Sequence, residues 1–252
     1  RDRSPSRGLG DVYKRQSMDT EYEAGVEMGR FFAEKGIKTA AIYGAFIPNP
    51  MHVYRVAGVL SGLGLSYDGA TEEGEVVGKI FTDQSVDLSK ISGDIQIVSY
   101  LQGYGDTTTD EINAAIQAKP EAFISVGMAT TFFTQQLNAA GIEFSDIDSF
   151  TQSNGEAITN GKLVYLAGKY SSSVGPAFAL VLNAINGNVI RDEQGNAVSL
   201  SQNYQVATDE ATFDEFYKSD NGDNPIYNKE TLDQIIGESV TFDEINELVT
   251  SK

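Results

Sequence analysis

The chain has 252 residues, a formal net charge of -18, 40% hydrophobic residues and no cysteine. This composition is typical of a globular protein with one or two cores, and no apolar run approaches the roughly 18 residues that a membrane span requires. An acidic surface repels phosphate backbones, which argues against nucleic acid as a partner. Because there is no cysteine and the only histidine is His52, we expect no metal site and no cofactor.

Residues 1–16 differ from the rest of the chain. They carry five basic and two acidic residues, a net charge of +3, whereas the remaining residues carry -21. The segment lacks apolar periodicity and the apolar centre of a signal peptide. We interpret it as a non-native or disordered tail that resembles a translated adapter sequence; a genuine basic arm is the alternative.

Short apolar runs alternate with amphipathic runs of helical spacing along most of the chain. The predicted strands are residues 38–43, 76–82, 95–99, 122–125, 147–150 and 163–167, and the predicted helices are residues 20–35, 50–63, 108–118, 128–140 and 173–186. This alternation implies right-handed βαβ crossovers. It predicts an α/β fold, a three-layer parallel sheet with helices on both faces.

The C-terminal part has a different character. A hairpin is predicted around residues 191–196, followed by short helices at residues 209–218, 229–237 and 242–250, which together form a helical C-terminal extension. The polar linker at residues 219–225 is interpreted as a turn, because an EF-hand loop starting at Asp220 would need Glu at its twelfth position and has Thr231.

Motifs for catalysis are missing. The chain has no phosphate loop, no dinucleotide fingerprint and no nucleophile elbow, and one histidine leaves little for a catalytic triad. The chain has 36 acidic residues, so their number alone does not exclude a pair of carboxylates that could catalyse glycoside hydrolysis. However, no acidic residue follows the predicted strand ends at Tyr43, Ser125 and Phe150. We therefore predict no catalytic residues, with a hydrolase as the weakest alternative.

Loops at the carboxyl ends of parallel strands meet at one edge of the sheet, where ligands bind. Here these loops and the helix after the first one contain aromatic, amide and cationic residues, which suit a small polar solute that is bound without chemistry. The predicted solute-binding residues are Phe46, His52, Arg55, Gln102, Tyr104, Met128, Gln152, Asn154, Lys169 and Tyr170. The alternatives are core packing for the aromatic residues and surface positions for the cations.

Several local patterns, in this order, resemble the C-terminal portion of a type 1 periplasmic solute-binding protein of the kind that delivers sugars to ABC importers. They are residues 19–25, 55–60, 119–125, 140–142 and 160–163. The resemblance covers about residues 19–190 and implies two lobes joined by a hinge, with the solute between them.

By this resemblance, residues 17–170 are the ligand-binding second lobe, and residues 171–252 are a remnant of the first lobe with the hairpin and C-terminal helices. Arg55 takes the position of a ligand-binding arginine, whose planar group presents a rigid fork of donors. The resemblance also implies ABC importer membrane subunits as partners and an extracytoplasmic location, in the periplasm or as a cell-surface lipoprotein. Most of the first lobe would be absent. One face of the helix at residues 173–186, with Val174, Phe178, Val181, Leu182 and Ile185, is therefore predicted to be unusually exposed or covered only by the C-terminal helices.

Two departures from the sugar-binding pattern leave alternatives. Sugar-binding members often have Asn-Asp after the strand corresponding to residues 122–125, where this chain has Val126–Met128. They also have Asp after the next strand, where this chain has Thr151 and Gln152. A nucleoside-type or peptide solute is therefore an alternative to a monosaccharide. A ligand-sensing domain of a transcription regulator with the same fold is a further alternative.

Overall fold

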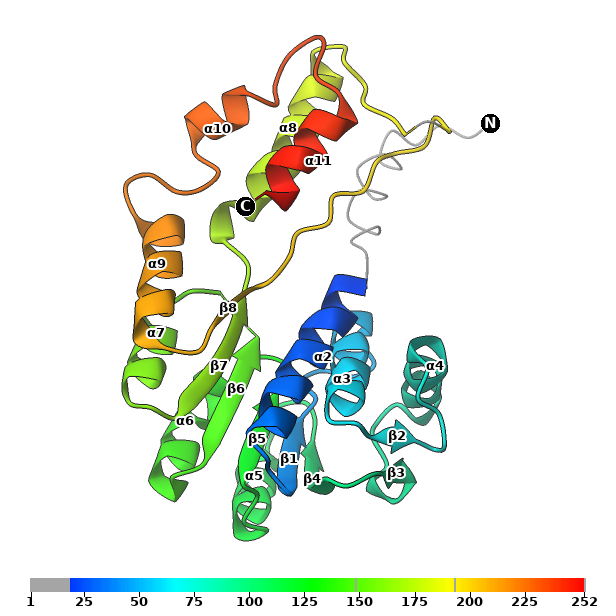
Figure 1. The fold of residues 1–252 in the computed structure, drawn as a ribbon, viewed down its shortest axis with the longest axis vertical. Coiled ribbons are helices and arrows are strands. Elements are labelled where there is room, and N and C mark those ends of the chain that lie inside the picture. Colours follow the sequence, from blue (N-terminus) through cyan, green and yellow to red (C-terminus); the bar gives the residue numbers. More distant parts are fainter. Residues whose placement is uncertain (1–18, 148, 193, 252) are drawn as a thin grey trace.

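The computed structural model describes residues 19–147, 149–192 and 194–251. Its centre is a six-stranded sheet in the order β4-β1-β5-β6-β7-β8 (Figure 1). Neighbouring strands from β4 to β7 are parallel, and β8 pairs antiparallel with β7 at the edge. The strands are β1 (Thr39–Tyr43), β4 (Gln96–Leu101), β5 (Ala122–Ser125), β6 (Glu143–Ile147), β7 (Leu163–Gly168) and β8 (Gln205–Ala207). The predicted α/β fold with a mostly parallel sheet is confirmed.

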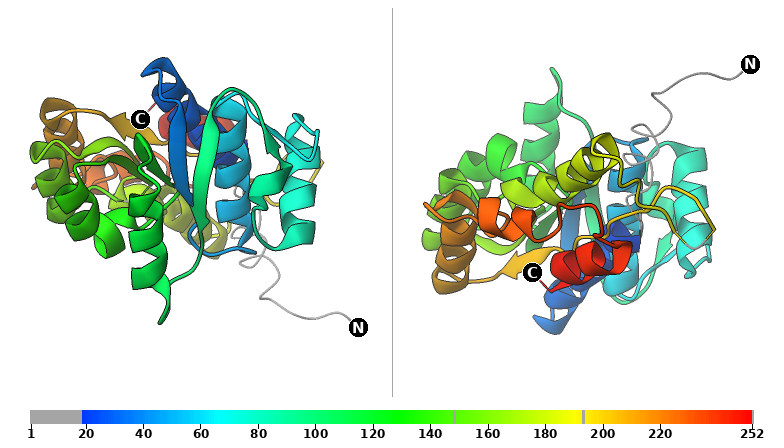
Figure 2. Two further views of the ribbon diagram at one scale, coloured as in Figure 1. Left: turned by 90° about the horizontal axis from the view of Figure 1, so that it is seen from below. Right: turned by 90° about the horizontal axis from the view of Figure 1, so that it is seen from above.

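Helices cover both faces of this sheet (Figure 2). On one face, the Ser145 hydroxyl of β6 lies 3.1 Å from the sulfur of Met28. On the other, the rings of Tyr43 and Phe123 contact Phe133 at centroid distances of 4.8 and 5.8 Å. The helices that lie between or before these strands include α2 (Asp19–Glu34), α3 (Pro50–Gly62), α5 (Thr108–Gln117), α6 (Ala129–Ala140) and α7 (Gln152–Thr159).

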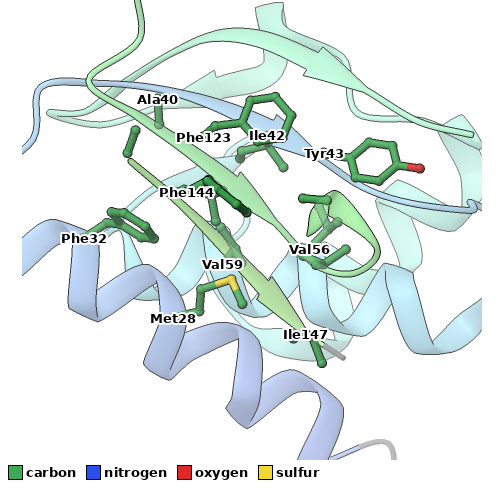
Figure 3. Close-up of a cluster of buried hydrophobic side chains, with 14 of the residues drawn as sticks. Met28, Phe32, Ala40, Ile42, Tyr43, Val56, Val59, Phe123, Phe144 and Ile147 are labelled. Atoms are coloured by element: carbon green, nitrogen blue, oxygen red, sulfur yellow. The ribbon is translucent and has the colours of Figure 1, made fainter. Parts of the chain in front are cut away.

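The main core lies between the sheet and these helices. Figure 3 shows Met28 and Phe32 of α2 beneath the strands that carry Ile42 and Phe144. All four side chains are 0% exposed. Burying side chains of this size stabilises the fold by about 1.5–3 kcal/mol each, so the central strands and the loops that follow them stand on a rigid base.

Helices α2 and α3 approach each other so closely that their backbones touch. A Cβ atom at Gly25 would lie 2.2 Å from the carbonyl oxygen of Arg55, and one at Gly58 would lie 2.1 Å from that of Tyr22. Gly29 makes the same kind of contact one turn further along, 2.4 Å from the carbonyl oxygen of Val59. Only glycine permits this spacing, which brings the polar side chains of α2 next to those of α3.

One predicted strand is wrong. Residues 76–82 belong to helix α4 (Glu73–Asp83), because Val76, Val77 and Ile80 are buried on one helical face. The helix is part of an excursion between α3 and β4 that also contains the antiparallel pair β2 (Ser66–Tyr67) and β3 (Ile91–Ser92). β-branched residues led the prediction toward a strand, whereas one-sided burial favours the helix.

The predicted strand at residues 147–150 is displaced. The observed strand β6 ends at Ile147, and Gln152 already begins α7, a helix that the prediction lacked. The Thr151 side chain caps this helix by accepting from the backbone N–H of Asn154. The residue directly after the strand is Asp148, which lies outside the described residues. The predicted lack of an acidic residue after this strand is therefore wrong, and one of the two arguments against a monosaccharide is lost.

The C-terminal residues divide between two cores. Helices α8 (Val174–Ile185), α10 (Lys229–Asp233) and α11 (Phe242–Thr250) form a small second core away from the sheet (Figure 1). In contrast, β8 and α9 (Glu210–Asn221) return to the main core through Ala207 and Phe213. Residues 171–252 are thus not one unit. The predicted hairpin is reduced to a single bridge between Arg191 and Ala197, and the predicted helix at residues 229–237 ends at Asp233.

Helix α8 has one covered and one open face. Ala179 and Leu180 pack into the second core against α11. On the open face, Val174, Phe178 and Ile185 are 66%, 58% and 75% exposed. This exposure confirms the prediction for these three residues, whereas Val181 and Leu182 are half-buried.

Candidate functional site

The loops that follow β1, β4, β5, β6 and β7 lie at one edge of the sheet, because neighbouring strands in this series are parallel. We call this edge the rim. The loops after β1 and β4 are joined by a hydrogen bond from the backbone N–H of Gly103 to the carbonyl oxygen of Ala45. A Cβ atom at Gly127, in the loop after β5, would lie 3.6 Å from Arg55 and 3.9 Å from His52. His52 and Arg55, the two residues of α3 that were predicted to bind a solute, therefore both face the rim.

Arg55 is held by three hydrogen bonds at the rim. Its Nε donates to Glu21 of α2 at 2.7 Å, and Nη1 donates to the carbonyl oxygen of Val126 at 2.9 Å. Its Nη2 donates to the Tyr204 hydroxyl at 2.6 Å. The side chains of Arg55 and Glu21 are only 7% and 3% exposed, so this is a buried ion pair.

Lys169 joins the same group from the loop after β7. Its Nζ donates to the second carboxylate oxygen of Glu21 at 3.3 Å and lies 4.3 Å from the centre of the Tyr204 ring. The Tyr204 hydroxyl donates to Glu21 at 2.7 Å. We call Glu21, Arg55, Lys169 and Tyr204 the rim cluster. Two cations thus share one buried carboxylate within this cluster.

The electrostatics of the rim cluster favour ionised Glu21. Burial would raise the pKa of this carboxyl, but Arg55, Lys169 and the hydrogen bond from Tyr204 outweigh burial and hold the pKa below its usual value. Burial lowers the pKa of Lys169 more than Glu21 raises it. Burial also lowers the pKa of His52, and it outweighs the opposing effect of the Phe46 carbonyl oxygen, which lies 3.1 Å from His52 Nδ1.

The lowered pKa of Glu21 predicts an acid-sensitive contribution to stability. A carboxyl whose pKa is depressed in the folded state stabilises the fold fully above its unfolded pKa, and that contribution is lost as the pH falls through the folded pKa. We expect the free energy of unfolding, measured with urea between about pH 6 and about pH 3, to fall less steeply in Glu21→Gln than in the wild type. The exposed Glu143→Gln variant is the control, and equal slopes for Glu21→Gln and the wild type would contradict the prediction.

His52 and Phe46 contact each other at the start of the rim. The backbone N–H of Phe46 donates to His52 Nδ1 at 3.0 Å, and the two rings lie 6.0 Å apart. His52 is buried, whereas Phe46 is 40% exposed. The imidazole thus shapes the loop after β1, and the phenyl ring is the group available to a solute.

An exposed aromatic stack stands at the loop after β4. The Tyr104 ring, 59% exposed, stacks on Phe132 of α6 with a centroid distance of 4.2 Å. The neighbouring Gln102 donates to the carbonyl oxygen of Gln84 at 3.1 Å. Tyr104 therefore offers an open ring face, while Gln102 ties the loop to the end of α4.

The other predicted residues occupy less open positions. Met128 precedes α6 in a left-handed conformation with φ of 69°. Gln152 is exposed and donates to Glu156, and it borders a groove between α7 and α9. Asn154 is fully buried and donates to the carbonyl oxygen of Ser149 at 2.6 Å. Tyr170 is buried against Phe150. These contacts stabilise the loops, and the roles of these residues in binding stay predictions.

Sequence reasoning missed Glu21 and Tyr204, which complete the rim cluster. It also missed Asp146, a buried carboxylate beneath the rim that accepts from the Thr130 backbone N–H at 2.8 Å and from the Ser125 hydroxyl at 3.2 Å. Asp146 fixes the start of α6 relative to the end of β5. Little in the sequence signalled Asp146, because its strand also contains the polar residues Glu143 and Ser145.

A cavity of about 260 Å³ lies next to the rim cluster. Its lining includes Lys169 and Tyr170 after β7, Gln202 and Asn203 before β8, and Tyr227. Among the residues that the structure describes, no group of three or more His, Cys, Asp or Glu side chains could hold a metal ion. In the same residues, no helix combines the length and apolarity needed to cross a bilayer.

Solved structures of periplasmic solute-binding proteins share this fold, in which a mostly parallel sheet gathers its loops at one rim. A periplasmic solute-binding protein of an ABC transporter from Actinobacillus succinogenes, with bound D-allose, is similar over 78% of this chain and 62% of its own, at 15% identity and TM-score 0.54. The periplasmic binding component of an arabinose ABC transporter from Shewanella sp. ANA-3 is similar over 79% of this chain and 60% of its own, at 16% identity and TM-score 0.53. A sugar-binding protein of an ABC transporter from Bacillus halodurans is similar over 78% of this chain and 64% of its own, at 12% identity and TM-score 0.55.

These likenesses show the fold, and the chain spans 60–64% of the length of the three structures. No family model matches the chain, and no curated protein matches it either. The three similar proteins are described as binding components of transporters.

Proposed function

We propose that this chain belongs to an extracytoplasmic solute-binding protein that delivers a small polar solute, a sugar or a similar molecule, to an ABC importer. The observation that carries the proposal is the rim, where the buried Arg55 and the half-buried Lys169 lie on the same sheet edge as the exposed rings of Phe46 and Tyr104. Donors fixed by burial and flat apolar faces together suit a polar solute with a hydrophobic side. The role is binding rather than catalysis, in keeping with the transporter components to which the fold is similar.

We also propose that the chain supplies one lobe and part of a second. The share of the similar structures that it spans supports this division, as does the open face of α8. In a longer protein, the rest of the first lobe would pack on Val174, Phe178 and Ile185. The solute would then be enclosed between the rim and that lobe, and the importer membrane subunits would be the partners.

A thermal-shift screen against monosaccharides, nucleosides and short peptides tests the proposal. A solute that binds only the folded state stabilises it, by about 2.7 kcal/mol at a concentration 100 times its Kd. We expect one class to raise the Tm and Arg55→Lys to weaken that shift, because lysine lacks the rigid fork of donors. Chemical conversion of the solute would contradict a pure binding role. A DNA-binding domain in the longer protein would favour the regulator alternative.

The screen is run on this chain and on the longer protein in parallel. A single lobe offers only part of the contacts, so we expect weaker shifts from this chain. If no class stabilises either protein, the proposed function is wrong.

A further inference from the structure

The cavity of about 260 Å³ beside the rim cluster is built from four separate parts of the chain. Residues 169–173 follow β7, residues 202–205 lead into β8, Tyr227 lies between α9 and α10, and residues 249–251 end α11 (Figure 1). One water molecule needs only roughly 10–15 Å³ of such space. The cavity is therefore large enough for a small organic molecule.

One side of the cavity is open to solvent. Its lining residues Asn203, Thr250 and Ser251 are exposed. In contrast, Tyr170 and Tyr227 are buried and form the inner wall. A small molecule can therefore enter from solvent and rest against protein.

The lining is rich in groups that form hydrogen bonds but contains a single charge. The amides of Gln202, Asn203 and Gln205 contribute to it, as does the hydroxyl of Ser173. Among the described residues, Lys169 is the one charged side chain of the lining, and no carboxylate faces it there. Such a wall suits a ligand with one negative charge and further polar groups.

The charge of Lys169 is not balanced within the rim cluster. Glu21 carries one negative charge, and it pairs with Arg55 at 2.7 Å but with Lys169 only at 3.3 Å. In the part of the chain that the structure describes, this is the one hydrogen bond of the Lys169 ammonium, which has three donors. Burial lowers the pKa of Lys169 more than Glu21 raises it. A half-buried cation without a counter-ion of its own is costly, and an anion in the adjacent cavity would supply one.

We propose that this cavity is a second binding site, separate from the aromatic faces of the rim, for a small monovalent carboxylate that pairs with Lys169. The carboxylate accepts hydrogen bonds from the ammonium, and a hydroxyl group next to it bonds to the amides of the wall. A monoanion suits the site better than phosphate, because the rim cluster has one surplus positive charge and the described lining has no arginine fork. The site does not depend on the proposed function. It gives Lys169 and Tyr170, which were predicted to bind the solute of the rim, a different ligand.

Titration with glycolate tests this site. Glycolate is a monoanion with a hydroxyl group next to its carboxylate, and glycolamide is its neutral analogue of the same shape. With sodium chloride holding the ionic strength constant, we expect glycolate to raise the Tm by at least about 2 °C, because it binds the folded state alone. We expect no shift from glycolamide and a smaller shift from inorganic phosphate. Saturation-transfer NMR detects the contact with glycolate directly.

Lys169→Met and Lys79→Met form a matched pair of variants. Lys169→Met removes the charge of the cavity and leaves Glu21 and Arg55 as a balanced pair, so the variant should fold and bind glycolate about tenfold or more weakly. Lys79→Met removes a lysine that pairs with Asp68 in the excursion between α3 and β4, and it should bind glycolate like the wild type.

Asn203→Asp is an independent variant that keeps Lys169. It places a carboxylate in the wall of the cavity, where it repels the anion and pairs with Lys169 in its place. We expect glycolate to bind this variant more weakly than the wild type, and this result carries the decision if Lys169→Met does not fold.

Four outcomes would overturn the inference. They are the absence of both a Tm shift and saturation transfer with glycolate, equal shifts from glycolate and glycolamide, a larger shift from phosphate, and unchanged affinity in Lys169→Met. Loss of glycolate binding in Tyr104→Ala but not in Lys169→Met would place the anion at the rim instead. The screen with monosaccharides and nucleosides is separate, because those molecules carry no carboxylate, so failure of either site leaves the other standing.

Discussion

Replacing Gly25 by alanine is expected to lower the free energy of unfolding by about 1–3 kcal/mol, the usual cost of inserting a methyl group into a tightly packed contact. The new Cβ would meet the backbone of α3, 2.2 Å from the carbonyl oxygen of Arg55 and 3.0 Å from the Cα of Gly58. Backbone atoms cannot rotate away, so α2 and α3 must separate. Equilibrium unfolding in urea, followed by circular dichroism, measures the effect.

The same substitution at Gly78 is the matched control. Gly78 lies in the interior of α4, and a Cβ there would meet no atom within 4 Å. Alanine in a helix is favoured over glycine by about 0.5–1 kcal/mol, so Gly78→Ala should stabilise the protein. Opposite signs at the two positions would identify the helix contact as the cause. If Gly25→Ala were as stable as the wild type, the close approach of α2 and α3 would be wrong.

Much of the fold could be predicted because its strongest signals are local. Residues 39–43 and 122–125 are short apolar runs between turns, and each is a buried strand in the centre of the sheet. Residues 76–82 misled the prediction because β-branched side chains there lie on one face of a helix, in an excursion outside the main sheet. The edge strand β8 has only three residues, which is too short to give a period in the sequence.

The rim could be predicted in outline but not its central contacts. Strand order places Arg55 and Lys169 near one edge, and the sequence pattern was sufficient for that. However, Glu21 is 34 residues from Arg55, 148 from Lys169 and 183 from Tyr204, so their contacts depend on the complete topology. Along the sequence, Glu21 is one acidic residue among several near the start of a helix. Its role became visible only when the glycine contact brought α2 against α3.

Replacing Arg55 by methionine is expected to lower the free energy of unfolding by about 3–5 kcal/mol, because it removes one partner of a buried ion pair. The variant leaves Glu21 with Lys169 and Tyr204, and it leaves the carbonyl oxygen of Val126 without the donor it has in the wild type. The exposed Arg30→Met on α2 is the control and should change stability by no more than about 0.5 kcal/mol. Urea unfolding near neutral pH compares the two variants.

Arg55→Lys then separates charge from geometry. Lysine keeps the positive charge beside Glu21, but its single ammonium cannot reach Glu21, Val126 and Tyr204 together as the planar guanidinium does. We expect its stability to lie between those of the wild type and Arg55→Met. If Arg55→Lys matched the wild type, charge alone would account for the pair, and the three directed hydrogen bonds would contribute little. If Arg55→Met were also unchanged, Arg55 would not be buried against Glu21 in solution, and a solute could engage it without disturbing the rim cluster.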